Sequence, residues 1–462
     1  MQGSLATPYV PSSTTQVAAA DSAVAQTETH ARPSVSEHPP EEASADALRE
    51  PRTASTTGAD QASARSPLAA LPIGLPHFYR ALNELQLGRR AEHVRITFFG
   101  DSHVAADFYT GRLRQLLQQR FGNGGPGFVP IGVPSVRHEQ VLSQRFGKWQ
   151  REPASAASYQ TQGDGRYGLS GMRAAALNAT AEAQVKLQPG ALAALASDTI
   201  TWELVYRLNR PQSLFSLQVG SEKPRRVSGE IGRSHQDQGT RVRASRLQGF
   251  RFDAPKDARI RVATTADRPE FFGLIGETAR AGLVLDTLGI NGARARTILG
   301  WHAGTWQGEL AEREPSLVVL AYGTNEVGDG TQVESYRGFY QQIRERVREA
   351  APEAECLLIG PTERVDAHLT VLPRAQLLDA TLRQTAAELG CAYHSWLSLI
   401  AESGGLRAWT QGSPQLAAND RIHLTRAGYQ RLAEELFAEL MSSYGQIYGE
   451  GAPAARSRAD VR

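Results

Sequence analysis

Two kinds of hydrophobic pattern follow one another along this chain. Residues 94–99 form a short β-branched and aromatic run, and apolar residues then recur at helical spacing from Phe108 to Phe121. Such a run predicts a buried strand, and such spacing predicts an amphipathic helix. The same alternation resumes after residue 292. Strands that alternate with helices of this length predict a parallel sheet with right-handed crossover connections.

The elements of this alternating part can be placed from the pattern. We expect strands at 94–99, 317–321, 356–359 and 392–394. We expect helices at 71–89, from Ser102 to about residue 120, at 293–310, 332–348 and 373–389, and from about residue 425 onward. Pro373 suits the first position of its helix, because the backbone amide there has no helical acceptor in any case. In sheets of this kind ligands bind at the carboxyl ends of the strands, so we expect the chemistry there.

The long segment between the two alternating parts has a different pattern. Strands are predicted at 199–206, 213–219 and 259–264, with clusters of Gly, Pro, Asp and Ser between them. A crossover between neighbouring parallel strands takes a few tens of residues at most, so a segment this long forms a domain of its own. Short strands with turn signals favour a β-sandwich. The sequence predicts an α/β domain made of residues 68–135 and 280–448, interrupted by an inserted β-sandwich at 136–279.

The two ends of the chain lack the apolar residues that a core needs. Residues 1–67 are rich in Ala, Ser, Thr, Pro, Glu and Gln, and residues 449–462 are polar. Neither end can bury enough surface to offset the entropy of ordering, so we expect a disordered N-terminal region and a flexible tail. No run of about 18 apolar residues is present, which predicts no membrane-spanning segment. The first residues also lack the pattern of a signal peptide.

The charge balance gives no indication of nucleic acid or an anionic membrane as a partner. The 462 residues include 50 basic and 48 acidic ones, for a formal net charge of +2. This balance produces no strong field for nucleic acid or for an anionic membrane.

The two cysteines are too few for a disulfide framework or a metal site. Cys356 and Cys391 lie in apolar stretches that are predicted strands. We expect buried free thiols, with a disulfide between adjacent strands as the alternative. No spacing of His, Cys, Asp and Glu indicates a metal site, and no glycine-rich loop has the phosphate-binding form.

Three segments place polar side chains at the ends of predicted elements. Gly100-Asp101-Ser102 follows the first strand, Asn325 follows the strand 317–321, and Asp420 and His423 lie just ahead of the last helix. Each has an ordinary explanation by itself: Asp420 can cap a helix, His423 can be an ordinary polar residue, and Asn325 can hold a turn. Because all of them lie at element boundaries, we expect them to share one site.

These residue types suit serine-based acyl chemistry. A serine at a strand-to-helix turn projects its hydroxyl at the edge of the sheet, and the helix N-terminus offers free N–H groups to a developing anion. A carboxylate three residues before a histidine orients the imidazole, which then takes the serine proton. We expect Ser102 as nucleophile, His423 as general base and Asp420 as its orienting carboxylate. Asp101 is expected to brace the turn, and His103 has no base role because neighbouring side chains at a helix start point apart.

These segments resemble the sequence blocks of the SGNH (GDSL-type) hydrolase superfamily. The resemblance covers roughly residues 93–135 and 280–440, with four blocks in order. It implies a flavodoxin-like α/β fold, with helices on both faces of a parallel sheet. Carried over residue by residue, it implies the catalytic residues Ser102, Asp420 and His423 and the oxyanion-hole residues Ser102, Gly292 and Asn325. In the glycine block, residues 286–293, Gly292 is favoured and Gly289 is the competitor.

The residues around these blocks resemble those of the branch that contains bacterial peptidoglycan O-acetylesterases. Residues 100–108, the glycine-rich 121–127 and 286–292 carry this narrower resemblance. It implies hydrolysis of O-acetyl esters on a cell-wall glycan through an acyl-enzyme, without a cofactor or metal, in the cell envelope or periplasm. The alternatives are an acetylesterase for another polysaccharide, an O-acetyltransferase, and a non-catalytic glycan-binding protein.

In that branch the resemblance implies a carbohydrate-binding-module-like sandwich at the position of the insertion. Trp149, Tyr159, Tyr167 and Trp202 are the candidates for stacking on sugar rings, although core or rim packing is the commoner role of each. Glycan recognition and a purely structural wall are equally compatible with this pattern.

Overall fold

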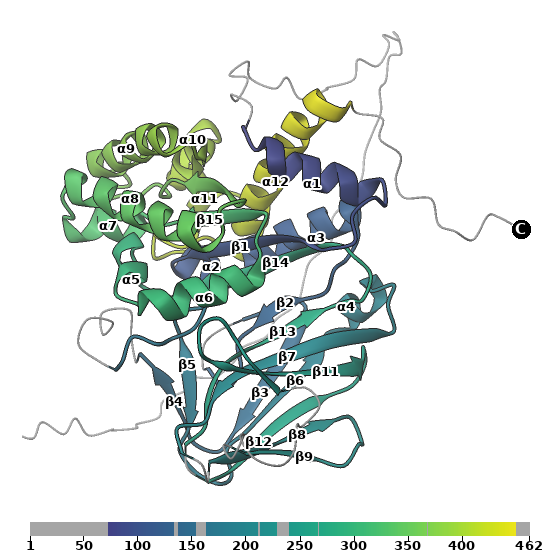
Figure 1. The fold of residues 1–462 in the computed structure, drawn as a ribbon. Helices are drawn as coiled ribbons and strands as arrows, with labels where there is room; N and C mark the ends of the chain where they lie inside the picture. The colour runs from purple at the N-terminus through teal and green to yellow at the C-terminus, as the bar shows by residue number, and fades with distance from the viewer. Residues whose placement is uncertain are drawn as a thin grey trace, which may run out of the picture. The chain divides into compact units, whose positions relative to one another are not determined.

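The computed structural model describes residues 73–133, 137–153, 163–210, 213–228, 240–266, 268–366 and 368–449. They contain one parallel sheet and two antiparallel sheets (Figure 1). The predictions for residues 1–67 and for all but the first residue of 449–462 lie outside the described residues. Among the helices that are described, none combines the length and apolar character needed to cross a membrane.

The five strands of the parallel sheet lie in the order β14-β1-β15-β16-β17. Their bounds are β1 Val94–Gly100, β14 Leu283–Gly289, β15 Leu317–Ala321, β16 Glu355–Ile359 and β17 Ala392–His394. Every neighbouring pair is parallel. The strand order places β1 between β14 and β15, so the carboxyl ends of all three strands meet at one edge.

Helices cover both faces of this sheet, because its strands are apolar on both sides. Along β15, Leu317 and Val319 pack into one core, whereas Val318 and Leu320 pack into the other. This alternation follows from the two-residue period of a strand, and burial on both faces explains the continuous apolar runs in the sequence. The predicted α/β fold is confirmed.

The helices divide between these two cores. The first core contains side chains of α1 (Pro76–Gln86), α2 (Ser102–Ala105), α3 (Phe108–Phe121), α10 (Trp396–Glu402), α11 (Gly405–Gln411) and α12 (Arg426–Tyr448). The second contains side chains of α5 (Ala295–Leu299), α6 (Ala303–Arg313), α7 (Thr324–Asp329), α8 (Val333–Ala350) and α9 (Pro373–Leu389).

The residues between α3 and β14 form two antiparallel sheets. One has the order β10-β11-β7-β13-β5-β4, with β2 paired to β13, and the other has the order β3-β6-β12-β8-β9. The bounds are β2 Gly127–Val129, β3 Val141–Phe146, β4 Trp149–Glu152, β5 Arg173–Ala176, β6 Glu182–Leu187, β7 Thr199–Arg207, β8 Leu214–Val219, β9 Arg225–Ser228, β10 Thr240–Val242, β11 Gln248–Pro255, β12 Ile260–Ala266 and β13 Glu270–Glu277; α4 is Pro189–Ala194. A third core, with side chains from both sheets, lies between them.

Strand β2 lies before the range 136–279 predicted for the insertion. It pairs with β13 along Gly127, Phe128 and Val129, and so belongs to the antiparallel part. Three residues beside a run of glycines give too short a pattern to be recognised as a strand from the sequence.

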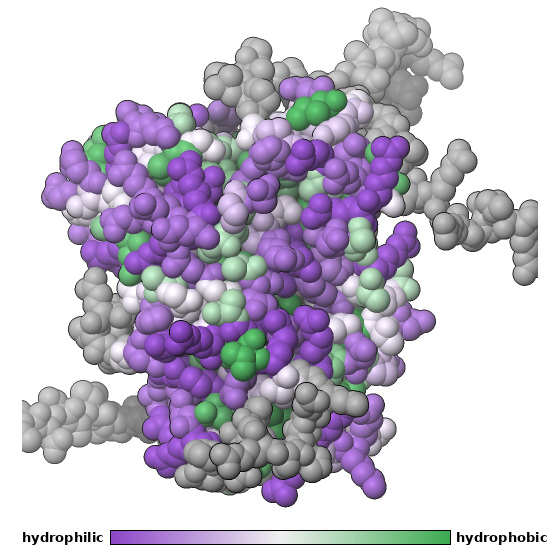
Figure 2. All heavy atoms as spheres, in the orientation of Figure 1, coloured by the Kyte–Doolittle hydropathy of each residue, from purple (hydrophilic) through white to green (hydrophobic). Residues whose placement is uncertain are grey.

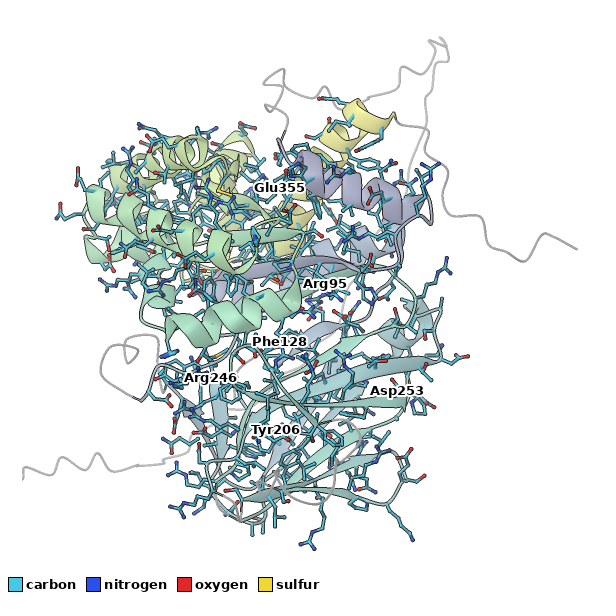
Figure 3. All side chains as sticks on the ribbon, viewed as in Figure 1. Arg95, Phe128, Tyr206, Arg246, Asp253 and Glu355 are labelled. Atoms are coloured by element: carbon cyan, nitrogen blue, oxygen red, sulfur yellow. A yellow bond between two sulfur atoms is a disulfide. The ribbon has the colours of Figure 1, made fainter. Side chains whose placement is uncertain are left out.

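The seven-stranded sheet is fastened to the α/β part by a shared core and by a buried ion pair. Phe128 of β2 and Phe272 of β13 pack in the same core as Trp306 of α6, and Figure 3 shows Phe128 at this junction. Nearby, a terminal nitrogen of Arg313 on α6 lies 2.8 Å from a carboxylate oxygen of Glu277 on β13, and their side chains are only 4% and 17% exposed. Removing one partner of such a pair would leave an uncompensated buried charge, so the junction is held firmly.

The face of the molecule in Figure 2 is mostly hydrophilic, with apolar residues scattered over it. Over the described ranges, the large exposed apolar side chains are Leu87, Leu142, Phe146, Leu177, Val242, Leu377 and Ile447. They come from both the α/β part and the antiparallel part. Scattered residues of this kind do not by themselves mark a docking surface.

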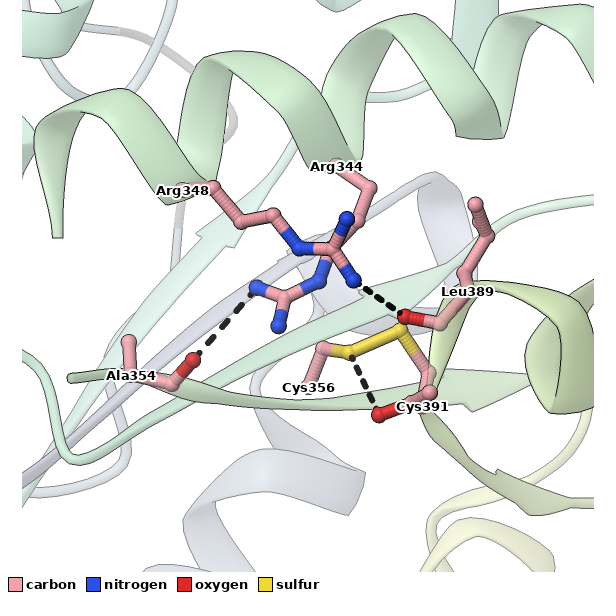
Figure 4. The surroundings of a disulfide bond; sticks show 7 residues. Arg344, Arg348, Ala354, Cys356, Leu389 and Cys391 are labelled. Atoms are coloured by element: carbon pink, nitrogen blue, oxygen red, sulfur yellow. Dashed lines mark hydrogen bonds between the residues drawn. A yellow bond between two sulfur atoms is a disulfide. The ribbon is translucent and has the colours of Figure 1, made fainter. Parts of the chain in front are cut away.

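Cys356 and Cys391 form a disulfide, so the expectation of two free thiols is wrong (Figure 4). In the pairing of β16 with β17, Leu357 lies beside Ala392. This register puts the two cysteines, one residue earlier on each strand, next to each other. Their Cα atoms are 4.8 Å apart, within the range that a disulfide spans. The sequence does not contain the register, and therefore did not decide between thiols and disulfide.

Replacing both cysteines by alanine is expected to lower the free energy of unfolding by about 2–4 kcal/mol, because the cross-link restricts the unfolded chain. Urea denaturation of the wild type and of Cys356→Ala/Cys391→Ala measures the difference. A reductant should destabilise the wild type and leave the double variant unchanged. If full reduction, verified by thiol titration, leaves the wild-type midpoint where it was, the disulfide does not contribute to stability.

Candidate active site

Ser102 lies at the turn between β1 and α2, at the carboxyl end of the parallel sheet. The carboxylate of Asp101 caps the helix by accepting a hydrogen bond from the backbone N–H of His103 at 2.9 Å. Gly100 is required by close packing, since a Cβ atom there would lie 2.3 Å from the Val104 side chain. The tight turn leaves the serine partly exposed at the edge of the sheet.

Ser102, His423 and Asp420 are joined in that order by hydrogen bonds. Ser102 Oγ lies 2.8 Å from His423 Nε2, and His423 Nδ1 lies 2.6 Å from Asp420 Oδ2. The other carboxylate oxygen accepts from the backbone N–H groups of Ile422 and His423 at 3.0 and 2.9 Å. Partial burial acts to raise the pKa of Asp420, but these hydrogen bonds outweigh it and lower that pKa to about 2. The ionised carboxylate favours the tautomer in which His423 Nε2 accepts the serine proton.

The loop that carries His423 is fixed by its own hydrogen bonds. The backbone N–H of Ala418 donates to the His423 carbonyl at 2.8 Å. Thr425 caps α12 by accepting from the backbone N–H of Gly428 at 3.2 Å. The helix therefore starts where the sequence pattern places it, and the histidine sits immediately before a well-anchored helix end.

Asn325 bridges the turns that follow β14, β1 and β15. It lies in the first turn of α7, after β15, and its side-chain amide donates to the Ala293 carbonyl at 2.9 Å. The same nitrogen lies 3.4 Å from Oδ2 of Asp101. Ala293 follows β14 and Asp101 follows β1, so the amide sits between the serine turn and the glycine turn. A donor in this place can stabilise an oxyanion that forms at the serine.

The two candidate glycines have different surroundings. Gly292 lies in a turn with a φ of +76°, a conformation that favours glycine. Gly289 ends β14 opposite Gly100, and a Cβ atom there would lie 2.1 Å from the backbone nitrogen of Ala105. Gly289 is thus needed to admit α2 against the sheet, and Gly292 stays the candidate donor.

Glu326, a residue that no sequence motif marks, is buried beside these turns. One of its oxygens accepts from the backbone N–H of Ala295 at 2.8 Å, which ties α7 to the segment after β14. Burial raises the pKa of Glu326 to about 7, and burial together with the charge of Glu326 raises the pKa of Asp101 to about 8. The only sequence signal is an acid directly after Asn325, which resembles an ordinary residue of a first helical turn.

His103 is buried against His423. Its Nδ1 lies 3.0 Å from the hydroxyl oxygen of Tyr429, and the two imidazole rings are 5.4 Å apart between centroids. Burial, with a smaller effect from His423, lowers the pKa of His103 to about 3, so its ring is neutral. A neutral ring here packs against His423 without repelling the charge that the general base acquires.

The aromatic residues considered for sugar stacking are mostly buried. Trp202 and Tyr167 are 3% and 1% exposed. Trp149 is half-buried, packs against the third core and donates from Nε1 to the Phe146 carbonyl at 2.8 Å. Tyr159 lies outside the described residues. The three described rings therefore contribute to packing.

The part of the chain that the structure describes has no group of three or more His, Cys, Asp or Glu side chains placed to hold a metal ion.

Residues 269–431 match the model of the GDSL-like Lipase/Acylhydrolase family. This segment contains Gly292, Asn325, Asp420 and His423. Ser102 precedes it, because the antiparallel sheets separate the serine from the rest of the site along the chain. A comparison with curated proteins finds no match.

Several solved structures are similar to this chain. One titled "Peptidoglycan O-acetylesterase in action, 5 min" is 24% identical, with a TM-score of 0.65, and the alignment covers 80% of this chain and 96% of that one. Axe2, an acetylxylan esterase from Geobacillus stearothermophilus, is 18% identical with a TM-score of 0.29, over 38% of this chain and 76% of its own. TesA is 17% identical with a TM-score of 0.26, over 35% and 81%. The first likeness extends beyond the α/β part into the antiparallel sheets, and it shows a shared fold.

The buried acids make the stability of the protein depend on pH. In the unfolded chain both carboxyls lose their protons near pH 4, whereas the folded protein holds them up to about pH 8 at Asp101 and about pH 7 at Glu326. Between these limits the folded state binds more protons, so the free energy of unfolding falls as the pH rises. The slope is about 1.4 kcal/mol per pH unit for each proton of difference.

We expect Glu326→Gln to flatten this fall between pH 5 and 7, because an amide cannot lose a proton. Urea denaturation at a series of pH values measures the slope. Glu314→Gln, at a side chain that is 76% exposed, is the control and should leave the slope unchanged. A slope that is the same in Glu326→Gln and in the wild type would contradict the raised pKa.

A hydroxyl, an imidazole and a carboxylate from distant segments are thus hydrogen-bonded in a row at one edge of a parallel sheet. Most of these residues lie within the family match, and the fold is that of a solved O-acetylesterase. Residues 269–431 thus match the GDSL-like Lipase/Acylhydrolase family, the fold is that of an SGNH hydrolase, and the row of groups is that of an ester hydrolase.

Proposed function

We propose that this chain is a serine esterase that removes O-acetyl groups from a cell-wall glycan, acting as a peptidoglycan O-acetylesterase. The observation that carries the proposal is the 2.8 Å contact between Ser102 Oγ and His423 Nε2, with Asp420 behind the imidazole. The substrate is supported by the fold shared over 80% of the chain with a structure whose title names a peptidoglycan O-acetylesterase.

Catalysis passes through an acetyl-serine. Ser102 Oγ attacks the carbonyl carbon of the acetyl ester, and His423 Nε2 takes the hydroxyl proton. As the tetrahedral intermediate collapses, His423 gives that proton to the sugar oxygen, and the sugar alcohol leaves. Water then attacks the acetyl carbon with the same proton transfers, which releases acetate and the free serine. Asp420 stays ionised throughout, since its pKa is about 2.

The negative charge of the intermediate falls on the former carbonyl oxygen, which needs donors. We assign this role to the backbone N–H groups of Ser102 and Gly292 and to the side-chain amide of Asn325. The raised pKa values of Asp101 and Glu326 serve the same end. Below about pH 7 both carboxyls are protonated and place no negative charge beside the oxyanion, whereas a charged pair there would repel it.

The disulfide supports a location outside the reducing cytoplasm, and we propose the cell envelope or periplasm. Disulfides form and persist in oxidising compartments and are rare in the cytosol. The bond between Cys356 and Cys391 joins two adjacent strands of the catalytic sheet. An acetylated cell-wall glycan would be present in the same compartment.

Ser102→Ala is expected to lower the release of acetate by at least about 10³-fold, because the acyl-enzyme cannot form. The assays are hydrolysis of p-nitrophenyl acetate and acetate release from O-acetylated peptidoglycan and from acetylated xylan. Retained hydrolysis in the variant would refute the mechanism. Preferential release from xylan would point to another polysaccharide, and transfer of acetyl to an added glycan would point to a transferase. If the wild type binds glycan but hydrolyses no ester, the chain is a non-catalytic glycan-binding protein.

Asn325→Ala is expected to lower kcat by about 10²–10³ with a smaller effect on KM, because its amide acts on the transition state. Steady-state kinetics with p-nitrophenyl acetate measure both constants. Asn83→Ala, on α1, is the matched control and should leave kcat unchanged. A kcat for Asn325→Ala equal to that of the wild type would remove Asn325 from the oxyanion hole.

A further inference from the structure

Two arginines stack on one phenylalanine ring beside the catalytic loop. The Cζ atoms of Arg137 and Arg426 lie 4.8 and 4.5 Å from the centroid of the Phe108 ring. Arg426 is the first residue of α12, three residues after His423, so their Cα atoms are at most about 11 Å apart. Phe108 opens α3 six residues after Ser102. The stacked group therefore lies where α3 and α12 begin, a short distance along the chain from Ser102 and His423.

One carboxylate balances these two cations among the described residues. Glu139 accepts hydrogen bonds from Nε of Arg137 and from both terminal nitrogens of Arg426. The side chain of Glu139 is 19% exposed, whereas those of Arg137 and Arg426 are 51% and 46% exposed. His138 adds no charge, because burial lowers its pKa to about 4. The group keeps one excess positive charge, and its cationic members face the solvent.

Buried contacts to α3 and to the residue before it fix the position of Glu139, and with it the two arginines. The backbone N–H of Glu139 donates to Asp107 at 2.7 Å, and Asp107 forms an ion pair with Arg114 in which both side chains are 0% exposed. Gly111 of α3 makes room for this contact, since a Cβ atom there would lie 2.7 Å from Cγ of Glu139.

Two residues at this place, Gly111 and Arg426, depart from the ordinary residue preferences of α-helices. A glycine inside a helix, as at Gly111, costs about 0.5–1 kcal/mol relative to alanine. A cation in the first turn of a helix, as at Arg426, faces the positive end of the helix dipole, which disfavours it by about 0.3–1 kcal/mol. Neither choice stabilises its helix, and departures of this kind are expected at functional sites.

We propose that Arg137 and Arg426 bind a carboxylate carried by the glycan whose acetyl ester Ser102 cleaves. Guanidinium groups bind carboxylates through paired N–H···O bonds, and stacking on Phe108 orients them in advance. Both terminal nitrogens of Arg137 lack partners within the described ranges and are free to donate. We call Arg137, Arg426, Phe108 and Glu139 the arginine clamp. It selects acidic over neutral glycans; this inference rests on the proposed esterase function and adds the class of its substrate.

The first test compares Arg137→Gln/Arg426→Gln with the wild type. For each enzyme, kcat/KM is measured for acetate release from O-acetylated peptidoglycan and for the uncharged ester p-nitrophenyl acetate. We expect the ratio of the two values to fall about tenfold or more, mainly through KM, because charge-assisted hydrogen bonds are lost. Arg431→Gln is the matched control, since Arg431 lies on the same helix, is 57% exposed and pairs with Glu435. It should leave the ratio unchanged.

The second test removes the carboxylates from the substrate. Carbodiimide coupling to a neutral amine converts the carboxylates of the same peptidoglycan to amides. The wild type should then lose about the same factor as the double variant, and the double variant should lose nothing further. O-acetylated alginate, with carboxylates on the sugar rings, distinguishes a ring carboxylate from one on a peptide stem.

The outcomes separate this inference from the proposed function. An unchanged ratio in Arg137→Gln/Arg426→Gln, or an equal effect on native and amidated polymer, would overturn the clamp while leaving the esterase intact. If the wild type hydrolyses p-nitrophenyl acetate but no glycan ester, the proposed function fails. Sedimentation of Ser102→Ala protein with native and amidated peptidoglycan then decides the clamp: binding that the two glutamines and amidation weaken alike supports it, and binding that neither change weakens refutes it. Thermal unfolding checks that the variants fold.

Discussion

The register between β1 and its two neighbours is the constraint on which the site depends. Gly100, the last residue of β1, lies opposite Gly289 of β14 and Ala321 of β15. The three strands therefore end in one row, and the turns that follow bring Ser102 and the amide of Asn325 to the same edge. A shift of one residue in either pairing would turn the side chains to the opposite face and separate these groups.

Close packing at that row explains both the glycines and the buried acids. A Cβ atom at Gly100 or at Gly289 would collide with α2, so the helix lies directly on the strand ends. Its first N–H groups are thereby brought to the sheet edge, where an oxyanion would form. Asp101 and Glu326 connect the turns from within, and their raised pKa values keep these buried contacts from placing charge beside the site.

The antiparallel sheets belong to the same structural unit as the catalytic sheet. The Arg313–Glu277 pair and the shared core around Trp306 fasten them at one place. The segment that leads into β3 is fastened at another, where Glu139 meets Asp107 and its side chain meets the start of α12. The antiparallel sheets are thus fixed relative to the catalytic sheet, which is compatible with both a structural role and contact with substrate.

Local patterns in the sequence determined four of the five strands of the parallel sheet, and Ser102, Asn325, Asp420 and His423 as candidates, because each depends on residues close together in the chain. The tertiary structure alone decided the features that depend on register and on burial. The disulfide requires β16 and β17 to be aligned, and β2 is a strand only because β13 lies beside it. The raised pKa of Glu326 and the pairing of two arginines on Phe108 come from segments that fold together. A one-dimensional pattern records which side chains are apolar or charged, but not which distant ones become neighbours.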